Sequence, residues 1–247
     1  MNDQQLLRYS RQIVLDGFDT DGQEQLLSSH VLVVGMGGLG SPVASYLASA
    51  GVGQLTVCDF DEVELSNLQR QTLHRDSRIG MNKALSAKIE LKAINNDCRI
   101  TPVTDRIDAG VLDQLIAGVD VIVDASDNFE TRHAINRACI KYLKPLVSGT
   151  AINYVGQIAV FDLRDQGAPC YACFVPEDTP KTVDHCSGSG VLASLTGTIG
   201  SMQATEVINL IVSGTSHLSG RALLYDARES EWSTIRIGKR EVCSACA

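Results

Sequence analysis

The stretch Val31-Leu-Val-Val-Gly-Met-Gly-Gly-Leu-Gly40 decides which fold we predict for this chain of 247 residues. Its first four residues are apolar and three of them are β-branched, which is typical of a strand buried on both faces. Glycines at positions 35, 37 and 40 follow directly, and residues 41–50 are typical of a helix rich in small side chains. Because free N–H groups at the start of a helix favour phosphate, this order of strand, glycine turn and helix predicts a nucleotide site.

The segments after the glycine loop predict the rest of the fold. Leu55-Thr-Val-Cys-Asp59 is typical of a second strand, and Asp59 lies about 20 residues beyond the glycine loop, where such folds bind a ribose hydroxyl. Strands and helices alternate as far as residue 149, which predicts a parallel doubly wound sheet. The later segments 156–163, 222–227 and 233–237 are typical of antiparallel strands, with one long helix near residues 200–211. We therefore predict an α/β fold with a Rossmann-like, mostly parallel sheet that antiparallel strands continue.

Charge and composition argue against several classes of protein. The formal net charge of -8 argues against a nucleic-acid binder, whose surface would be basic. Residues 1–30 are polar and charged, so we expect no signal peptide. Residues 31–53 and 186–205 lack charge over about the length of a membrane span, but both are full of glycine, serine or threonine, and we interpret neither as a span. We expect a cytoplasmic protein without a nucleic-acid or membrane partner.

Four of the eight cysteines form two CxxC pairs, Cys170-Tyr-Ala-Cys173 and Cys243-Ser-Ala-Cys246. Each pair fits one edge of a tetrahedral thiolate site, and two pairs fill such a site without leaving room for a catalytic water. We therefore favour a structural Zn²⁺ that ties the end of the chain to its middle, over disulfides or a redox-active CxxC. We interpret three further cysteines, Cys58, Cys98 and Cys139, as core residues.

Charged residues at the ends of the predicted strands favour a nucleoside triphosphate over a dinucleotide. Arg70 lies beyond the second strand, Lys83 begins a predicted helix, and Asp127 and Asn128 follow the strand that ends at residue 124. The carboxyl ends of the strands are the edge where open α/β sheets bind ligands. Two cations beside a phosphate-binding loop suit a triphosphate, and a carboxylate there can hold Mg²⁺. The GxxxxGK(S/T) motif of P-loop ATPases is absent from the sequence.

Several separate motifs resemble the MoeB/ThiF/HesA family, the bacterial relatives of ubiquitin-activating enzymes. The resemblance covers residues 6–246 and rests on the glycine loop, both CxxC pairs and the stretches Arg8-Tyr-Ser-Arg-Gln12, Ser66-Asn-Leu-Gln-Arg-Gln71, Asp124-Ala-Ser-Asp-Asn128 and Gly156-Gln157. The combination is far more specific than any single motif. It implies a homodimeric, Mg-ATP-dependent adenylyltransferase that acts on the C-terminal Gly-Gly carboxylate of a small ubiquitin-like sulfur-carrier protein.

The resemblance also implies roles for individual residues. It implies that Asn67, Arg70 and Lys83 contact the phosphates. It implies that Asp127 supports Mg²⁺ and is the main catalytic carboxylate, and that Arg11 reaches the nucleotide of the other subunit. The implied catalytic set is Asp127, Arg70, Lys83 and Arg11. The implied nucleotide-binding set comprises Gly35, Gly37, Gly38, Gly40, Asp59, Ser66, Asn67, Leu68, Gln69, Arg70, Lys83, Asp127 and Asn128. The resemblance assigns zinc to the four CxxC cysteines.

We expect a single adenylation domain over residues 1–247, with N-terminal helices in 1–30, a nucleotide-binding half in 31–150 and a carrier-binding, zinc-bearing half in 151–247. Because the chain stops one residue after Cys246, we expect no appended sulfur-delivering domain and a separate sulfur donor. Asp16-Gly-Phe-Asp-Thr-Asp-Gly-Gln23 and Leu73-His-Arg-Asp76 favour the small subunit of molybdopterin synthase as the carrier, over the thiamine-pathway sulfur carrier.

Alternatives stay open for one residue and for the activity. Cys186 lies in a polar, glycine-rich loop outside both CxxC pairs, so it is either a possible thiol nucleophile toward the carrier or a loop cysteine without a role. An NAD-dependent oxidoreductase would explain the glycine loop and Asp59, but it would leave Arg70, Lys83 and Asp127 without a function. A non-catalytic, zinc-stapled binding module would require ATP binding to be absent or silent.

Overall fold

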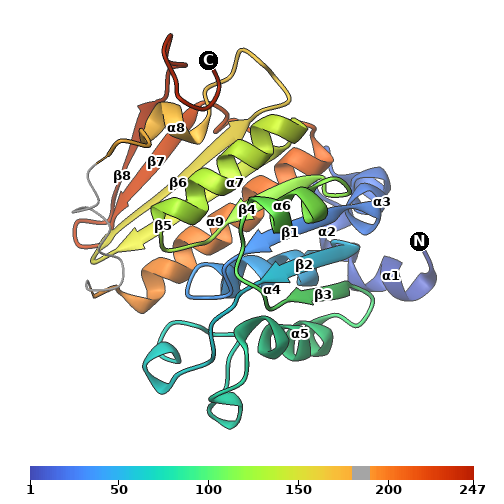
Figure 1. Cartoon of the computed structure of the whole chain (residues 1–247). Helices are drawn as coiled ribbons and strands as arrows, with labels where there is room; N and C mark the ends of the chain where they lie inside the picture. Colours follow the sequence, from blue (N-terminus) through green and yellow to red (C-terminus); the bar gives the residue numbers. More distant parts are fainter. Residues whose placement is uncertain (180–189) are drawn as a thin grey trace.

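The computed structural model describes residues 1–179 and 190–247, which fold around an eight-stranded sheet (Figure 1). The strand order is β3-β2-β1-β4-β5-β6-β7-β8. Neighbouring strands are parallel from β3 to β5, and β6, β7 and β8 continue the sheet as antiparallel strands. This arrangement confirms the predicted fold class. The strands are β1 (His30–Val34), β2 (Gln54–Cys58), β3 (Arg99–Val103), β4 (Val121–Asp124), β5 (Pro145–Ile152), β6 (Val155–Asp162), β7 (Arg221–Asp226) and β8 (Glu231–Arg236).

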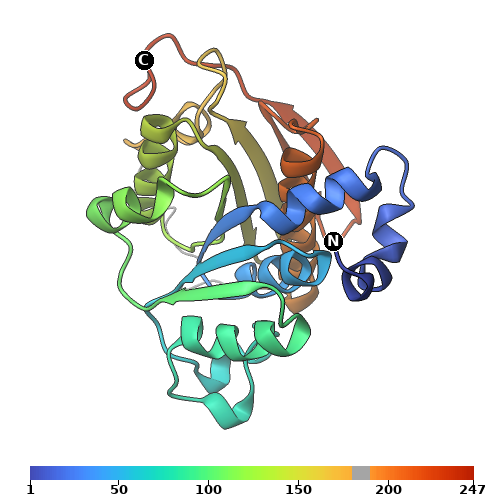
Figure 2. The same ribbon diagram turned by 90° about the vertical axis from the view of Figure 1, so that its right-hand side faces the viewer.

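Helices cover both faces of the sheet. Figure 2 shows α6 and α7 on one face, with α4 and α9 on the other. Among the described residues, no helix is both long enough and apolar enough to cross a bilayer. The helices are α1 (Asp3–Arg8), α2 (Ser10–Ile13), α3 (Asp19–Ser28), α4 (Gly40–Ala50), α5 (Lys83–Ile94), α6 (Ala109–Ile116), α7 (Phe129–Tyr142), α8 (Tyr171–Phe174) and α9 (Ala193–Val212), with short 3₁₀ helices η1 (Leu65–Asn67) and η2 (Asp76–Arg78).

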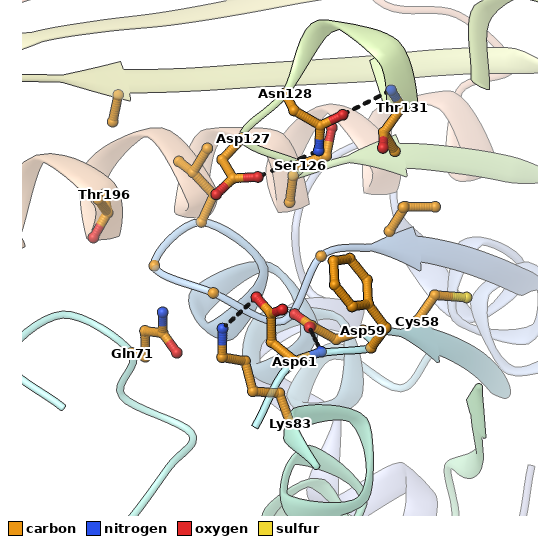
Figure 3. Close-up of a pocket in the computed structure, with 18 of the residues that line it drawn as sticks. Cys58, Asp59, Asp61, Gln71, Lys83, Ser126, Asp127, Asn128, Thr131 and Thr196 are labelled. Atoms are coloured by element: carbon orange, nitrogen blue, oxygen red, sulfur yellow. Dashed lines mark hydrogen bonds and ion pairs between the residues drawn. The ribbon is translucent and has the colours of Figure 1, made fainter. Parts of the chain in front are cut away.

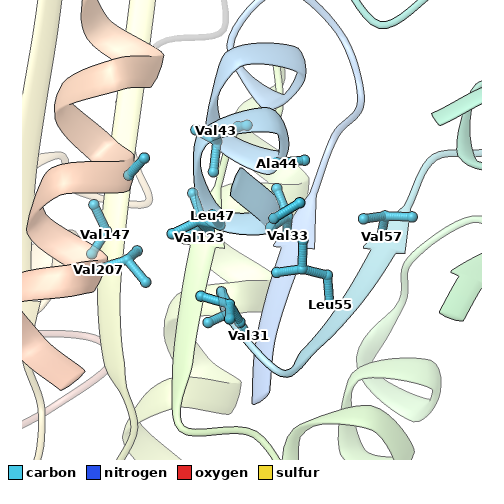
Figure 4. Packing of buried hydrophobic residues seen from close by; sticks show 14 of the residues in the cluster. Val31, Val33, Val43, Ala44, Leu47, Leu55, Val57, Val123, Val147 and Val207 are labelled. Carbon is cyan, nitrogen blue, oxygen red and sulfur yellow. The ribbon is translucent and has the colours of Figure 1, made fainter. Parts of the chain in front are cut away.

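Alternate residues of β1 pack into two separate hydrophobic cores. Val31 and Val33 point toward α4 and α9, where they join Leu47 and Val207 (Figure 4). Leu32 and Val34 belong to the cluster on the opposite face, under α6 and α7. All four side chains of this run are buried, as the sequence pattern predicts for a central parallel strand. The glycine loop therefore leaves the sheet from a central strand that is packed on both faces.

Helix α9 differs most from the sequence-based expectation, because it begins at Ala193 and not near residue 200. Its first turns contain Thr196, Gly197 and Thr198, which have weak helix propensities and hide the helical pattern. Leu195 and Thr196 are nevertheless buried, and their burial stabilises these turns. As a result, the start of α9 reaches the ligand-binding edge of the sheet.

Candidate nucleotide site and cysteine cluster

A cavity of about 330 Å³ lies at the carboxyl ends of β1 and β4. The connection after β1 leads to β2 on one side, whereas β4 and β5 extend the sheet on the other, so the strand order reverses between β1 and β4. Such a reversal leaves a crevice between the two connections, and open α/β sheets bind ligands there. The cavity is lined by the glycine loop, the segment after β2, the segment after β4 and the start of α9 (Figure 3).

The glycine loop requires the absence of side chains at two positions. Gly35 has a φ of +96°, and a Cβ there would lie 2.5 Å from the carbonyl oxygen of Ala125. A Cβ at Gly40 would lie 1.8 Å from the carbonyl oxygen of Gly35, because α4 begins directly against the end of β1. Both glycines are therefore required by close packing against neighbouring backbone. The loop lines the cavity with backbone alone at Gly37 and Gly38.

We expect Gly40→Ala to destabilise the fold by about 3 kcal/mol or more, because a Cβ at 1.8 Å from a carbonyl oxygen forces the backbone to move. Urea denaturation measures the change. Gly118→Ala is the matched control, since a Cβ at Gly118 meets nothing within 4 Å. Equal stability of the two variants would contradict the packing described here.

Asp59 holds the glycine loop in place. Its carboxylate accepts hydrogen bonds from the backbone N–H groups of Met36 (2.8 Å) and Asp61 (2.9 Å). Burial raises the pKa of Asp59, while the charge of nearby Lys83 and the two N–H groups act in the opposite direction. Each carboxylate oxygen has two lone pairs, so the two bonds leave acceptor sites unused. Asp59 lines the cavity, and its predicted bond to a ribose stays a prediction.

Two cations line the cavity on the side of α5 and η1. Lys83 is only 7% exposed, and its Nζ lies 3.0 Å from Oδ2 of Asp61. The side chain of Asn82 caps the first turn of α5 by accepting from the N–H of Ala84 (2.9 Å), which fixes the start of the helix that carries Lys83. Arg70 is half-buried and donates from Nη1 to the carbonyl oxygen of Ser66 (3.2 Å). The structure therefore places both predicted cations at one cavity.

Asp127 brings a carboxylate to the cavity from the end of β4. Its side chain is exposed, and its hydrogen bond from Nδ2 of Asn128 is long, at 3.4 Å. Asn128 caps α7 by accepting from the N–H of Thr131 (2.9 Å). In Figure 3, Asp127 and the Lys83–Asp61 pair lie on opposite sides of the glycine loop. A ligand on this loop would lie between the carboxylate and the cation.

A buried network supports the backbone that precedes Asp127. Asp124 is 1% exposed, and its carboxylate accepts from the hydroxyl groups of Ser126 (2.6 Å) and Ser148 (2.7 Å). The guanidinium of Arg132 lies 3.5 Å from Asp124 and also donates to the carbonyl oxygen of Ser126. A buried ion pair with further hydrogen bonds restricts the backbone to one arrangement. The network therefore fixes the position from which Asp127 extends.

The CxxC cysteines form the second cluster of chemical interest. Their Sγ atoms all lie within 4.8 Å of one another. The distances are 3.9 Å for Cys170–Cys173, 3.7 Å for Cys170–Cys243 and 3.6 Å for Cys173–Cys246. A disulfide needs about 2.05 Å. A tetrahedral thiolate site with zinc–sulfur bonds of about 2.3 Å has edges of roughly 3.8 Å. The cluster therefore fits a zinc site.

The backbone around the cluster favours thiolate at one ligand. Burial opposes ionisation of Cys243, but backbone N–H groups of Ala245 and Cys246 donate to its sulfur and lower its pKa to about 7. The other cysteines that the structure describes behave as predicted. Cys58, Cys98 and Cys139 are buried, and burial raises the pKa of Cys58 and of Cys98 to about 12.

A sequence profile of the ThiF family matches residues 9–245. The chain belongs to the ThiF family. It is 46% identical over 246 residues to the molybdopterin-synthase adenylyltransferase of Escherichia coli strain K12, with 100% of this chain and 98% of that protein covered. It is also 46% identical over 245 residues to the adenylyltransferase and sulfurtransferase MOCS3 of Drosophila willistoni, with coverage of 98% of this chain and 53% of that protein. The chain thus spans about half the length of the Drosophila relative.

Solved structures resemble the ThiF-family fold described above. The crystal structure of E. coli MccB with ATP has a TM-score of 0.85 and 23% sequence identity, covering 97% of this chain and 73% of that chain. The complex of MccB with N-formylated MccA has a TM-score of 0.86 at 22% identity, covering 97% and 75%. At these identities the likeness concerns the fold alone.

The structure gathers part of the predicted ThiF-family site. The predicted residues that line the cavity are Gly35, Gly37, Gly38, Asp59, Gln69, Arg70, Lys83, Asp127 and Asn128. The predicted residues that do not line it are Gly40, Ser66, Asn67, Leu68 and Arg11. The side chain of Asn67 instead bonds Oγ of Ser66 (3.2 Å), and Arg11 is exposed on α2. Cys186 lies outside the described residues.

Several residues that line the cavity of this ThiF-family chain were not predicted from the sequence. Arg106 lies over the ring of Phe60, with 4.1 Å between its Cζ and the ring centroid, and both residues line the cavity. Asp61 pairs with Lys83, which lies 22 positions later in the sequence. Gln71 is 4% exposed, and its buried Oε1 has no hydrogen-bond partner among the described residues. Only Gln71 had a sequence signal, since it ends the quoted Ser66–Gln71 motif.

Proposed function

We propose that this chain uses ATP to adenylate the C-terminal glycine carboxylate of a small ubiquitin-like sulfur-carrier protein, with release of pyrophosphate. The observation that carries the proposal is one cavity lined by the bare glycine loop, Arg70, Lys83 and Asp127. Membership of the ThiF family and the named E. coli relative support the same chemistry. The small subunit of molybdopterin synthase is the favoured carrier, and the thiamine-pathway sulfur carrier is the alternative.

The cavity residues fit a nucleoside triphosphate. The glycine loop offers backbone N–H groups at the start of α4, where the helix dipole favours an anion. The carboxamide of Gln71 lies beside the loop, since a Cβ at Gly37 would lie 3.5 Å from its Nε2, and it has hydrogen-bonding capacity to spare. Its buried Oε1 lacks a donor, which costs about 1–3 kcal/mol, and a ribose hydroxyl or the adenine amino group of bound ATP would supply that donor.

The reaction needs positioning and charge neutralisation rather than proton transfer. The carrier carboxylate is already a nucleophile, so it can attack the α-phosphorus without a general base. Arg70 and Lys83 would stabilise negative charge on the phosphate oxygens, with Lys83 exchanging the half-exposed carboxylate of Asp61 for phosphate. Asp127 would hold Mg²⁺, which neutralises phosphate charge when bound.

Several further assignments belong to the same proposal. Residues 1–247 would form one adenylation domain, with nucleotide binding in 31–150 and carrier binding and structural zinc in 151–247. Asp59 and Gly38 would contact the nucleotide, with Ser66, Asn67, Leu68, Gln69 and Asn128 beside it. Two copies would form a homodimer in the cytoplasm, in which Arg11 reaches the partner's nucleotide. A separate donor would then supply sulfur to the adenylated carrier.

Isothermal titration with ATP and with NAD tests the proposal against its rivals. The proposal predicts saturable ATP binding that depends on Arg70, and no comparable NAD binding. Tight NAD binding with weak ATP binding would favour an oxidoreductase. Binding of neither nucleotide would favour a non-catalytic module.

We expect Cys186→Ala to retain ATP–pyrophosphate exchange within about threefold of the unmodified protein, because carboxylate attack on ATP needs no thiol. Exchange is measured with the carrier present and with zinc content verified. Loss of exchange in a folded, zinc-loaded variant would refute the prediction that adenylation does not require the thiol of Cys186. A carrier conjugate that dithiothreitol reduces, and that the variant cannot form, would instead favour the thiamine-pathway carrier.

A further inference from the structure

His74 is a buried titratable residue to which the proposed reaction gives no role. It lies between η1 and η2, is 4% exposed and does not line the cavity. Its Nε2 lies 2.9 Å from the carbonyl oxygen of Met36, and its Nδ1 lies 2.9 Å from Oγ of Ser86. The imidazole therefore bridges the glycine loop, which contains Met36, and helix α5, which contains Ser86.

The contacts define the tautomer of His74. A carbonyl oxygen only accepts hydrogen bonds, so Nε2 must carry the hydrogen that bonds Met36. Nδ1 of the neutral ring then accepts from the hydroxyl of Ser86. Burial lowers the pKa of His74, and the charges of Lys83, Arg78 and Arg75 add to this effect. These effects outweigh the bond to Met36, which raises the pKa, and favour the neutral ring with its hydrogen on Nε2.

Met36 is held from both sides. Its N–H donates to Asp59 (2.8 Å), and its carbonyl oxygen accepts from His74 (2.9 Å). Met36 stands between Gly35 and Gly37, whose flexible backbones would otherwise allow the loop many conformations. Two bonds to one residue fix the peptide planes on either side of it, and with them the directions of the loop N–H groups.

The second bond of His74 connects the loop to the helix that carries Lys83. Ser86 lies on α5, one turn after Lys83. Arg78 reinforces this helix turn by donating from Nη1 to the carbonyl oxygen of Ser86 (2.7 Å). Through His74, the backbone N–H groups of the loop and the ammonium of Lys83 are held in one frame.

We propose that His74 is a positioning residue that orients the glycine loop relative to Lys83 for phosphate binding. The inference rests on the proposed function, since it takes the ligand to be ATP. Preorganisation of this kind acts on binding, because a loop that is already ordered loses less conformational entropy when the ligand arrives. The effect should therefore fall on the affinity for ATP and on its KM more than on kcat.

Two substitutions separate the bonds of the imidazole. In His74→Gln the side-chain amide reaches about as far as Nε2 and can still donate to Met36, whereas the shorter amide of His74→Asn reaches only the Nδ1 position, near Ser86. We expect H74N to weaken ATP binding in titration calorimetry about tenfold, because a loop without the bond from His74 to Met36 must be ordered when ATP binds. H74Q should stay within about threefold of the unmodified protein. His217→Asn, at an exposed histidine, is the control and should leave the affinity unchanged.

The outcomes distinguish the inference from the proposed function. H74N should raise the KM for ATP about tenfold and change kcat less than threefold. Equal ATP affinity for H74N and H74Q would overturn the inference, whether both variants bind ATP normally or both bind it weakly. Nitrogen NMR of the unmodified protein should show the Nε2–H tautomer, and an Nδ1–H tautomer would overturn it even if H74N failed to fold. Absence of ATP binding by the unmodified protein would contradict the proposed function. In that case, amide exchange at Met36 still tests His74, with faster exchange expected in H74N than in H74Q and equal rates contradicting its role.

Discussion

Replacing Asp127 with alanine is expected to lower ATP–pyrophosphate exchange by roughly a thousandfold or more, because charge stabilisation through a bound metal contributes several kcal/mol and each ~1.4 kcal/mol is tenfold in rate. The side chain is exposed, and its hydrogen bond from Asn128 is long, so the fold does not depend on it. The variant should therefore unfold at the same temperature as the unmodified protein and still bind the carrier.

Glu130→Ala is the matched control for Asp127→Ala. It removes the same charge from the first turn of α7, but Glu130 is exposed and does not line the cavity. Its exchange rate should stay within about twofold of the starting value, as is usual for a surface substitution. Near-normal exchange by Asp127→Ala would place the catalytic carboxylate elsewhere.

Replacing Cys243 with serine is expected to remove zinc and to lower the melting temperature by roughly 6–12 °C, the shift that a loss of about 3 kcal/mol causes in a chain of this size. The four sulfur atoms lie within 4.8 Å of one another and join α8 to the C-terminal segment (Figure 1). Loss of one ligand opens the site and releases that segment, so metal content and stability should fall together.

Metal analysis and calorimetry on the same preparation measure both effects of Cys243→Ser. Ser244→Ala serves as the control, because it alters the adjacent exposed residue and keeps all four thiols. The control should retain one zinc per chain and a melting temperature within a few degrees. Full metal occupancy with normal stability in Cys243→Ser would refute the structural role of the cluster.

Local sequence patterns predicted those parts of the fold and site that depend on local structure. The run Val31–Val34 reads as a central strand because four successive buried side chains need apolar residues on both faces. Gly40 is required by its contact with Gly35 in the same loop. Gly35 is required by its contact with Ala125, which directly follows the neighbouring strand β4. The two CxxC spacings set the distance between the ligands of each pair, so the sequence predicted the cluster although it joins segments 73 residues apart.

The parts that the sequence did not predict depend on contacts between distant segments. The bond from His74 to Met36 joins residues 38 positions apart, and no local pattern indicates it. The contact of Arg106 with Phe60 likewise becomes visible only when the sheet edge is assembled. Helix α9 began earlier than predicted because burial against the sheet outweighs the weak helix propensity of its first turns.

ATP–pyrophosphate exchange in the presence of the small subunit of molybdopterin synthase tests the central proposal most directly. The proposal predicts exchange with the full-length carrier, and loss of exchange when the carrier's terminal glycine is removed, because the attacking carboxylate is then displaced from the α-phosphorus. The thiamine-pathway carrier, with and without its last glycine, decides between the two carriers in the same assay. Exchange that is unaffected by removal of the terminal glycine, or no exchange with either carrier, would contradict adenylation of a sulfur carrier.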